Sequence, residues 1–115
     1  MGAVAEVRPA TREDVLSFYG RLHRDTVKAV VEILDGKIIA IGGVRFAPDM
    51  LVAFASFTEE ARRFPVRMVK ECRALLNTVG HCPVYAITDT GSHKEERLLE
   101  VLGFRPYVEE IWRRN

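Results

Sequence analysis

The spacing of hydrophobic residues changes along the chain, and the changes separate strands from helices. A strand turns successive side chains to opposite faces, so alternating or β-branched stretches indicate strands, whereas spacings of three and four residues indicate helices. By this criterion we predict strands over residues 4–8, 27–34, 37–46, 50–57, 83–88 and 105–113.

Three helices are expected between these strands. Thr11, followed by an acidic first turn, begins a helix that runs to about residue 24, and Pro65 begins a second helix that ends before Gly80. Ser92 has an acidic residue three positions later, which is the spacing of a capping box, so a third helix starts there and stops at Gly103. The inward face of the second helix consists of Val66, Val69, Cys72, Leu76 and Val79.

Turn signals connect the strands that precede the second helix. Asp35-Gly36 predicts a two-residue hairpin, because a type I′ turn requires positive φ at both central residues. Gly42-Gly43 inside a strand indicates a bulge or a close backbone approach. The helix between strands 50–57 and 83–88 favours parallel pairing of those two strands. The predicted order is β-α-β-β-β-α-β-α-β, an α+β fold with a mixed β-sheet flanked by helices in one domain over residues 1–115.

The bulk composition is that of an ordinary globular chain. With 115 residues, 48% of them hydrophobic, and a net charge of +1, the chain gives no electrostatic indication of a nucleic-acid or membrane partner. No apolar run approaches the roughly 20 residues of a membrane span, and the first residues lack a signal-peptide pattern. Cys72 and Cys82 lie too far apart for a metal or redox pair, so we expect no metal site and a reducing, cytoplasmic location.

Three stretches, taken in order, resemble motifs of the GNAT N-acetyltransferases. They are residues 7–14 (VRPATRED), residues 35–43 (DGKIIAIGG) and residues 92–104 (SHKEERLLEVLGF), and the resemblance extends over nearly the whole chain. It implies the GNAT fold, with acetyl-CoA or another acyl-CoA bound in a V-shaped opening between strands 50–57 and 83–88. It also implies transfer of the acyl group to the amine of a small molecule or a protein.

The phosphate loop that this resemblance implies has an unusual sequence. In the family, a glycine-rich loop wraps the cofactor pyrophosphate with backbone N–H groups at a helix N-terminus. Here residues 61–67 (ARRFPVR) take that place without a glycine, and Pro65 removes one N–H donor. The resemblance assigns cofactor contacts to Phe57, Thr58, Arg62, Arg63, Phe64, Val66, Arg67 and Ser92.

Two functional residues of the family are replaced in this chain. Counted back from Gly103, the cofactor-facing Asn of the family corresponds to Ser92, and its general-acid Tyr corresponds to Leu99. Leucine cannot transfer a proton, so the catalytic residues stay unassigned. Tyr85 and Tyr107 are spare phenols for which the spacing gives no argument.

These departures resemble a narrower group, the small GNAT-like proteins encoded by phages, which include an internal virion protein of short-tailed phages. The shared features are the RPA opening at residues 8–10, the AIGG stretch at residues 40–43 and the glycine-poor, arginine-rich entry into the second helix. This narrower resemblance implies a fold used for virion assembly or host interaction, and a location in the virion.

The arginines around residue 65 leave two hypotheses open. Cations are disfavoured at a helix N-terminus by roughly 0.3–1 kcal/mol, and a bound phosphate relieves that cost. Alternatively, the acidic residues 59–60 neutralise the arginines on a solvated surface. The first hypothesis is a GNAT-like acyl-CoA-dependent N-acetyltransferase with a degenerate pyrophosphate loop. The second is a catalytically inactive GNAT-fold phage structural or host-interaction protein, in which Phe57 and Phe64 fill the cofactor opening.

The C-terminal strand carries bulky side chains, among them Tyr107 and Trp112. An edge strand with exposed aromatic residues pairs readily with another chain. A homodimer formed through this strand is a further hypothesis from the sequence.

Overall fold

The computed structural model describes residues 5–21, 26–58, 66–80, 82–87 and 93–115. The described elements, in chain order, are β1 (Ala5–Pro9), α1 (Arg12–Tyr19), β2 (Thr26–Leu34), β3 (Lys37–Phe46), β4 (Leu51–Phe57), α2 (Val66–Thr78), β5 (Val84–Ile87), α3 (His93–Val101), β6 (Arg105–Val108) and β7 (Ile111–Arg114). They form an α+β domain with a mixed seven-stranded sheet, which confirms the predicted fold class.

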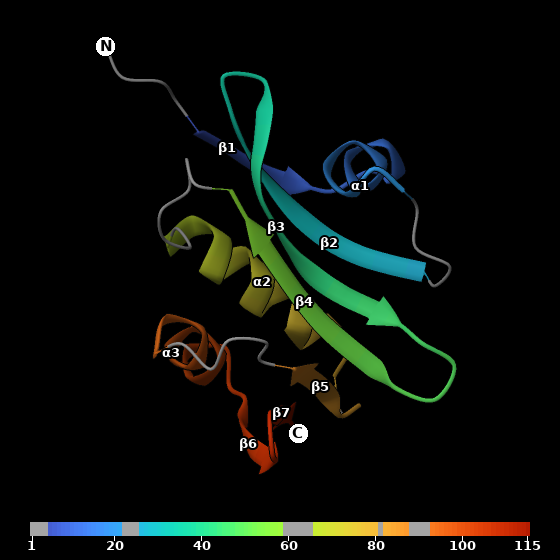
Figure 1. Ribbon diagram of the computed structural model, residues 1–115, viewed down its shortest axis with the longest axis vertical. Coiled ribbons are helices and arrows are strands. Elements are labelled where there is room, and N and C mark those ends of the chain that lie inside the picture. The colour runs from blue at the N-terminus through green and yellow to red at the C-terminus, as the bar shows by residue number, and fades with distance from the viewer. Residues whose placement is uncertain (1–4, 22–25, 59–65, 81, 88–92) are drawn as a thin grey trace.

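The strands lie in the order β1-β2-β3-β4-β5-β7-β6 (Figure 1). Strands β1 to β4 form an antiparallel meander, and β4 pairs with β5 in parallel, as predicted from the helix that connects them. The predicted hairpin between β2 and β3 is confirmed, since Asp35 and Gly36 have φ values of 52° and 77°.

Helix α1 is shorter than predicted. Thr11 accepts a hydrogen bond from the Asp14 N–H, and the Asp14 side chain accepts one from the Thr11 N–H, which completes a capping box. The helix ends at Tyr19 instead of residue 24, because Gly20 adopts the left-handed conformation at φ 75°. Its N–H donates to the Leu16 carbonyl oxygen at 2.8 Å, as in a glycine C-cap.

The pair Gly42-Gly43 marks a close backbone approach and not a bulge. The register of β3 is regular at both glycines, and the irregularity between β2 and β3 lies instead at Glu32 and Ile33. A Cβ atom on Gly43 would lie 2.1 Å from the Lys28 carbonyl oxygen and therefore cannot be accommodated. Of the two predicted alternatives, the close approach is confirmed and the bulge is wrong.

The stretch 105–113 was predicted as one strand and forms two. Glu109, at φ 48°, and Glu110 make a turn between β6 and β7, which pair antiparallel. The chain reverses here, so β7 lies against β5 and β6 becomes the edge of the sheet. Trp112 on β7 is buried, whereas Tyr107 on β6 is 54% exposed.

Helices cover both faces of the sheet and produce two hydrophobic clusters. Helices α2 and α3 pack on one face, with Met68, Cys72, Leu76, Leu102 and Trp112 in the larger cluster. Helix α1 packs on the other face, where Val15 meets Val31 and Ile41. Burial raises the pKa of the Cys72 thiol to about 12. Within the described part of the chain, no helix has the length and apolar character needed to cross a membrane.

Candidate functional site

The parallel strands β4 and β5 pair over a short distance and then separate. Their register in the described chain consists of Leu51 with Val84 and Val52 with Tyr85. Strand β4 continues to Phe57, and beyond Val52 its only strand partner among the described residues is β3, so the pairing with β5 stops there. At about 3.4 Å per residue, the separated segment of β4 is about 17 Å long. We refer to this gap as the V opening, with its closed end at Val52 and Tyr85.

The wide end of the V opening lies where β4 ends. Phe57, the last residue of β4, is 43% exposed. The next residue, Thr58, donates its backbone N–H to the Ile39 carbonyl oxygen at 2.9 Å and its hydroxyl to the same oxygen at 3.3 Å. Thr58 therefore fixes the point at which the chain leaves the sheet.

Helix α2 begins with residues that the sequence assigned to cofactor binding. Val66 is 84% exposed at the first position of the helix, so its predicted place on the inward face is wrong; in this first turn Met68 is the buried residue. Arg67 follows Val66 on the exposed surface. The first turn of α2 contains no acidic residue, so its N-terminal backbone is not neutralised from within the helix. Of the predicted cofactor contacts, four lie outside the described residues: Arg62, Arg63, Phe64 and Ser92. The other four lie at the two ends of the connection from β4 to α2: Phe57 and Thr58 at the end of β4, and Val66 and Arg67 at the start of α2.

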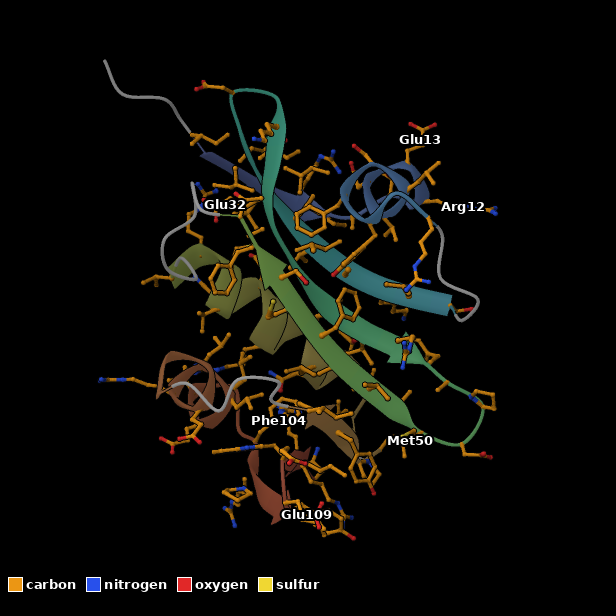
Figure 2. The ribbon with its side chains drawn as sticks, in the orientation of Figure 1. Arg12, Glu13, Glu32, Met50, Phe104 and Glu109 are labelled. Atoms are coloured by element: carbon orange, nitrogen blue, oxygen red, sulfur yellow. The ribbon has the colours of Figure 1, made fainter. Side chains whose placement is uncertain are left out.

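A buried carboxylate lies on the same face of the sheet as α2. The paired residues Val7, Glu32, Ala40 and Phe57 form a row across β1 to β4, and directly opposed residues share a face. Glu32 is 5% exposed, and its Oε2 has no hydrogen-bond partner among the described residues. Burial raises the pKa of Glu32, and the positive charge of Arg67 partly offsets that rise. Figure 2 shows Glu32 close to the end of β4.

Glu32 is a candidate functional residue that was not predicted from the sequence. Glu32 lies in a stretch of β-branched residues whose pattern is typical of an ordinary strand. Only the strand register, which pairs Glu32 with Ala40 and Ala40 with Phe57, places it in the same row as Phe57. A charged residue flanked by Val31 and Ile33 in a predicted central strand is the signal that was available, because such positions are rarely charged.

The structure also brings together the two spare phenols. Tyr85 and Tyr107 make an edge-to-face contact with ring centroids 5.9 Å apart. The Arg113 guanidinium lies 5.9 Å from the Tyr85 ring centroid and 5.4 Å from the Tyr107 ring centroid. Because Tyr85 pairs with Val52, this cluster lies beside the closed end of the V opening. Leu99, at the position of the family's general acid, is half-buried and packs against the larger hydrophobic cluster.

The separated segment of β4 has no strand partner on its β5 side among the described residues. A strand with no partner on one side can offer main-chain donors and acceptors to an elongated ligand. The exposed start of α2 can receive an anionic group at the wide end, and a phenol stands at the closed end. These are the features of a site for a long molecule with an anionic end and a reactive end.

Comparison with known proteins finds matches among solved structures only. No protein-family model matches the chain, and no curated protein matches it. The ribosomal-protein-S18-alanine N-acetyltransferase from Escherichia coli is 12% identical with a TM-score of 0.68, and the alignment covers 96% of this chain and 93% of that one.

Two further structures are similar to the same extent. A putative GnaT-family acetyltransferase from Bordetella pertussis is 17% identical with a TM-score of 0.64, over 90% of this chain and 71% of that one. An acetyltransferase of the GNAT family from Staphylococcus aureus Mu50 is 11% identical with a TM-score of 0.64, over 97% of this chain and 99% of that one. At these identities the likeness lies in the fold, and this chain has the fold of the GNAT acetyltransferases.

Proposed function

We propose that this protein is a GNAT-like N-acetyltransferase that transfers an acyl group from acetyl-CoA, or another acyl-CoA, to an amine. The observation that carries the proposal is the separation of β4 from β5 beyond Val52 and Tyr85. Fold similarity alone does not decide function, because one fold serves many chemistries. The V opening is a feature of the site itself, and it has the length and the chemical asymmetry that acyl-CoA requires.

The described residues fit the cofactor at both ends of the V opening. The edge of β4 from Ala53 onwards can hydrogen-bond to the amides of the pantetheine arm. The start of α2 can hold the pyrophosphate through backbone N–H groups and through Arg67, helped by Arg62 and Arg63 of the preceding loop. Phe57, Thr58, Phe64, Val66 and Ser92 are the further cofactor contacts that we propose.

Bound acyl-CoA supplies a thioester whose carbonyl carbon an amine can attack, and the sulfur must be protonated as it leaves. An arm that runs about 17 Å from Phe57 to Val52 ends beside Tyr85. We assign the hydroxyl of Tyr85 as the proton donor, in the role that Leu99 cannot perform. The Arg113 guanidinium packed on the Tyr85 ring restricts the position of that hydroxyl.

Calorimetric titration with CoA and acetyl-CoA tests the proposal. The experiment compares the natural protein with an Arg62→Ala/Arg63→Ala variant, an Arg67→Ala variant and an Arg12→Ala control, whose arginine lies on α1 (Figure 2). We expect micromolar binding, weakened about tenfold or more in the first two variants and unchanged in the control. Absence of binding at millimolar ligand would refute the proposal.

A specific observation favours the second hypothesis, a GNAT-fold interaction module without catalysis. Ile87, Tyr107 and Val108 are 62%, 54% and 51% exposed near one another on β5 and β6, and exposed apolar side chains of this kind mark protein contacts. On that hypothesis the edge strand β6 pairs with a second copy or with a host or virion protein. Light scattering tests the homodimer, and a monomer at high concentration would exclude it.

A further inference from the structure

Three arginines lie in one row across five strands of the sheet. The register pairs Arg45 with Val52, Val52 with Tyr85, Tyr85 with Arg113, and Arg113 with Arg105. Directly opposed residues share a face of the sheet. Val84, next to Tyr85, is buried against α2, so the row lies on the opposite face, where α1 packs. We call these five residues the arginine row.

The part of the arginine row on β5, β7 and β6 lies beyond the reach of α1. The cluster under α1 extends across the sheet as far as Phe54, and Tyr19 of α1 bonds to Ser56 on β4 at 3.0 Å. Figure 1 shows α2 behind β4, with no described helix in front of the lower half of β4 or of β5. Next to the row, Ile87 and Tyr107 are more than half exposed. This is a surface to which a second molecule has access.

The centre of the arginine row is ordered before any ligand arrives. Arg113 packs on the rings of Tyr85 and Tyr107, and these cation–π contacts hold the guanidinium in position. Yet neither Arg113 nor Arg105 has an ion pair or a hydrogen bond within the described part of the chain, and Arg113 Nε is buried without an acceptor. Arg113 and Arg105 therefore lie at opposed positions on β7 and β6 with no ion pair to a carboxylate among the described residues.

The spacing of the arginine row determines which anion it can accept. At about 4.8 Å between strands, the Cα atoms of Arg113 and Arg105 are about 5 Å apart, and the Cα atom of Arg45 is about 14 Å from that of Arg113. Guanidinium groups bind carboxylates through two parallel hydrogen bonds. Carboxylates on alternate side chains of an extended peptide share one face at a spacing of about 7 Å, which falls within this range of distances.

Nucleic acid fits the same surface less well. The whole chain has a net charge of +1, whereas non-specific nucleic-acid binding depends on many phosphate contacts. Glu109 and Glu110, at the turn beside the row, repel any anionic ligand that extends past β6 (Figure 2 labels Glu109). This limit disfavours a continuous polyphosphate more than it disfavours a short peptide with a few carboxylates.

We propose that the arginine row binds an acidic polypeptide segment, and that this segment carries the acceptor amine. The second part rests on the proposed acyltransferase function, because the row crosses β4 and β5 at the closed end of the V opening. An acidic segment bound there places a nearby amine next to Tyr85. The substrate class is a protein or peptide with at least two carboxylates close to its reactive amine.

Fluorescence anisotropy with a labelled glutamate-rich peptide tests the binding, with the same peptide carrying glutamine in place of glutamate as the reference. Arg113→Gln and Arg105→Gln are the test variants, and Arg12→Gln on α1 is the matched control. Arg105 is exposed, so its variant keeps the test valid if the Arg113 variant does not fold. We expect the glutamate peptide to bind at least tenfold more tightly than the glutamine peptide. We also expect that preference to be lost in both test variants and kept in the control.

Equal binding of the two peptides would overturn the inference. So would tighter binding of a single-stranded oligonucleotide that is lost in the same variants, because it would identify a nucleic-acid surface. The CoA titration separates this inference from the proposed function. If the protein binds the peptide but not CoA, the arginine row is an acidic-peptide site and the proposed acyltransferase function is wrong. If the protein binds CoA but not the peptide, the proposed function stands and the inference about the arginine row is wrong.

Discussion

Arg8 on β1 and Asp14 on α1 form a two-point ion pair, with Nη1 2.6 Å from Oδ2 and Nη2 3.0 Å from Oδ1. The same carboxylate accepts the Thr11 N–H at 2.7 Å, so one side chain both caps the helix and ties it to the sheet. Helix α1 has only eight residues, which is too short to be stable by itself. Its place on the sheet depends on this connection and on the Val15 contacts.

Replacing Asp14 by Asn should lower the free energy of unfolding by about 1–2 kcal/mol, because the variant loses the ion pair and part of the cap. The guanidinium of Arg8 lowers the pKa of Asp14 to about 2 from its ordinary 3.8. The folded state thus releases this proton more readily than the unfolded chain. The stabilisation is complete above about pH 5 and is lost as the pH falls towards 2.

Urea unfolding of the natural protein and of Asp14→Asn at several pH values measures this loss. The two stabilities should approach each other as the pH falls through 2. A difference that persists unchanged to pH 2 would contradict the role given to the charged form of Asp14.

Local chemistry accounts for most of what the sequence predicts correctly. The hairpin at Asp35-Gly36 follows from the φ values that the turn requires, and the parallel pairing of β4 with β5 follows from the helix that joins them. The turn at Glu109-Glu110 was missed because neither residue is a usual turn former, so the alternation across it looks like one continuous strand.

The site is less predictable than the fold because it depends on register. Val52 and Tyr85 are 33 positions apart, and nothing local in the sequence shows that they meet where the V opening begins. Strand register likewise produces the row that joins Glu32 to Phe57 and the arginine row. Pro65 and the resemblance to the phosphate loop of the family located the entry to α2, but the groups around the closed end come from three strands that are brought together only by folding.

Val66 allows stability and cofactor binding to be separated. This residue is 84% exposed at the first position of α2, so its side chain contributes little packing. Val66→Glu places a negative charge at the positive end of the helix and should raise the free energy of unfolding by about 0.3–1 kcal/mol. If the pyrophosphate binds there, the same charge should weaken CoA binding about tenfold or more by repulsion.

The uncharged Val66→Gln variant is the matched control, and thermal unfolding and calorimetry are the two measurements. We expect the glutamate and glutamine variants to differ in both quantities, in opposite directions. Equal CoA affinity for the two variants would place the phosphate groups elsewhere.

Tyr85→Phe tests the proposed proton donor. The substitution removes one hydroxyl and keeps the ring against Arg113, so CoA affinity should not change. Release of CoA during acyl transfer, followed with a thiol reagent, should show kcat reduced about 100-fold with KM unaltered, which is the low end for loss of a general acid. Tyr107→Phe is the control, and an equal loss in that variant would point to packing of the cluster instead of proton transfer.

Glu32 should make the protein less stable as the pH rises. Burial raises the pKa of this carboxyl group above its ordinary 4.5, so the folded state holds the proton more firmly than the unfolded chain does. The free energy of unfolding therefore falls as the pH increases from 4.5 through the raised pKa, and ionised Glu32 costs stability at pH 7. Glu32→Gln should remove this pH dependence and be the more stable protein at pH 7.

The difference in urea midpoint between the natural protein and Glu32→Gln, measured from pH 4.5 to pH 8, isolates this effect, because the Asp14 contribution is the same in both proteins. The difference should grow with pH in favour of the variant. A variant that is less stable at pH 7 would mean that the attraction between Glu32 and Arg67 exceeds the cost of burying the charge. In that case the charge of Glu32 would hold the start of α2 through Arg67. Arg67→Met should then lower the free energy of unfolding more in the natural protein than in Glu32→Gln, because only the natural protein has a carboxylate for Arg67 to pair with.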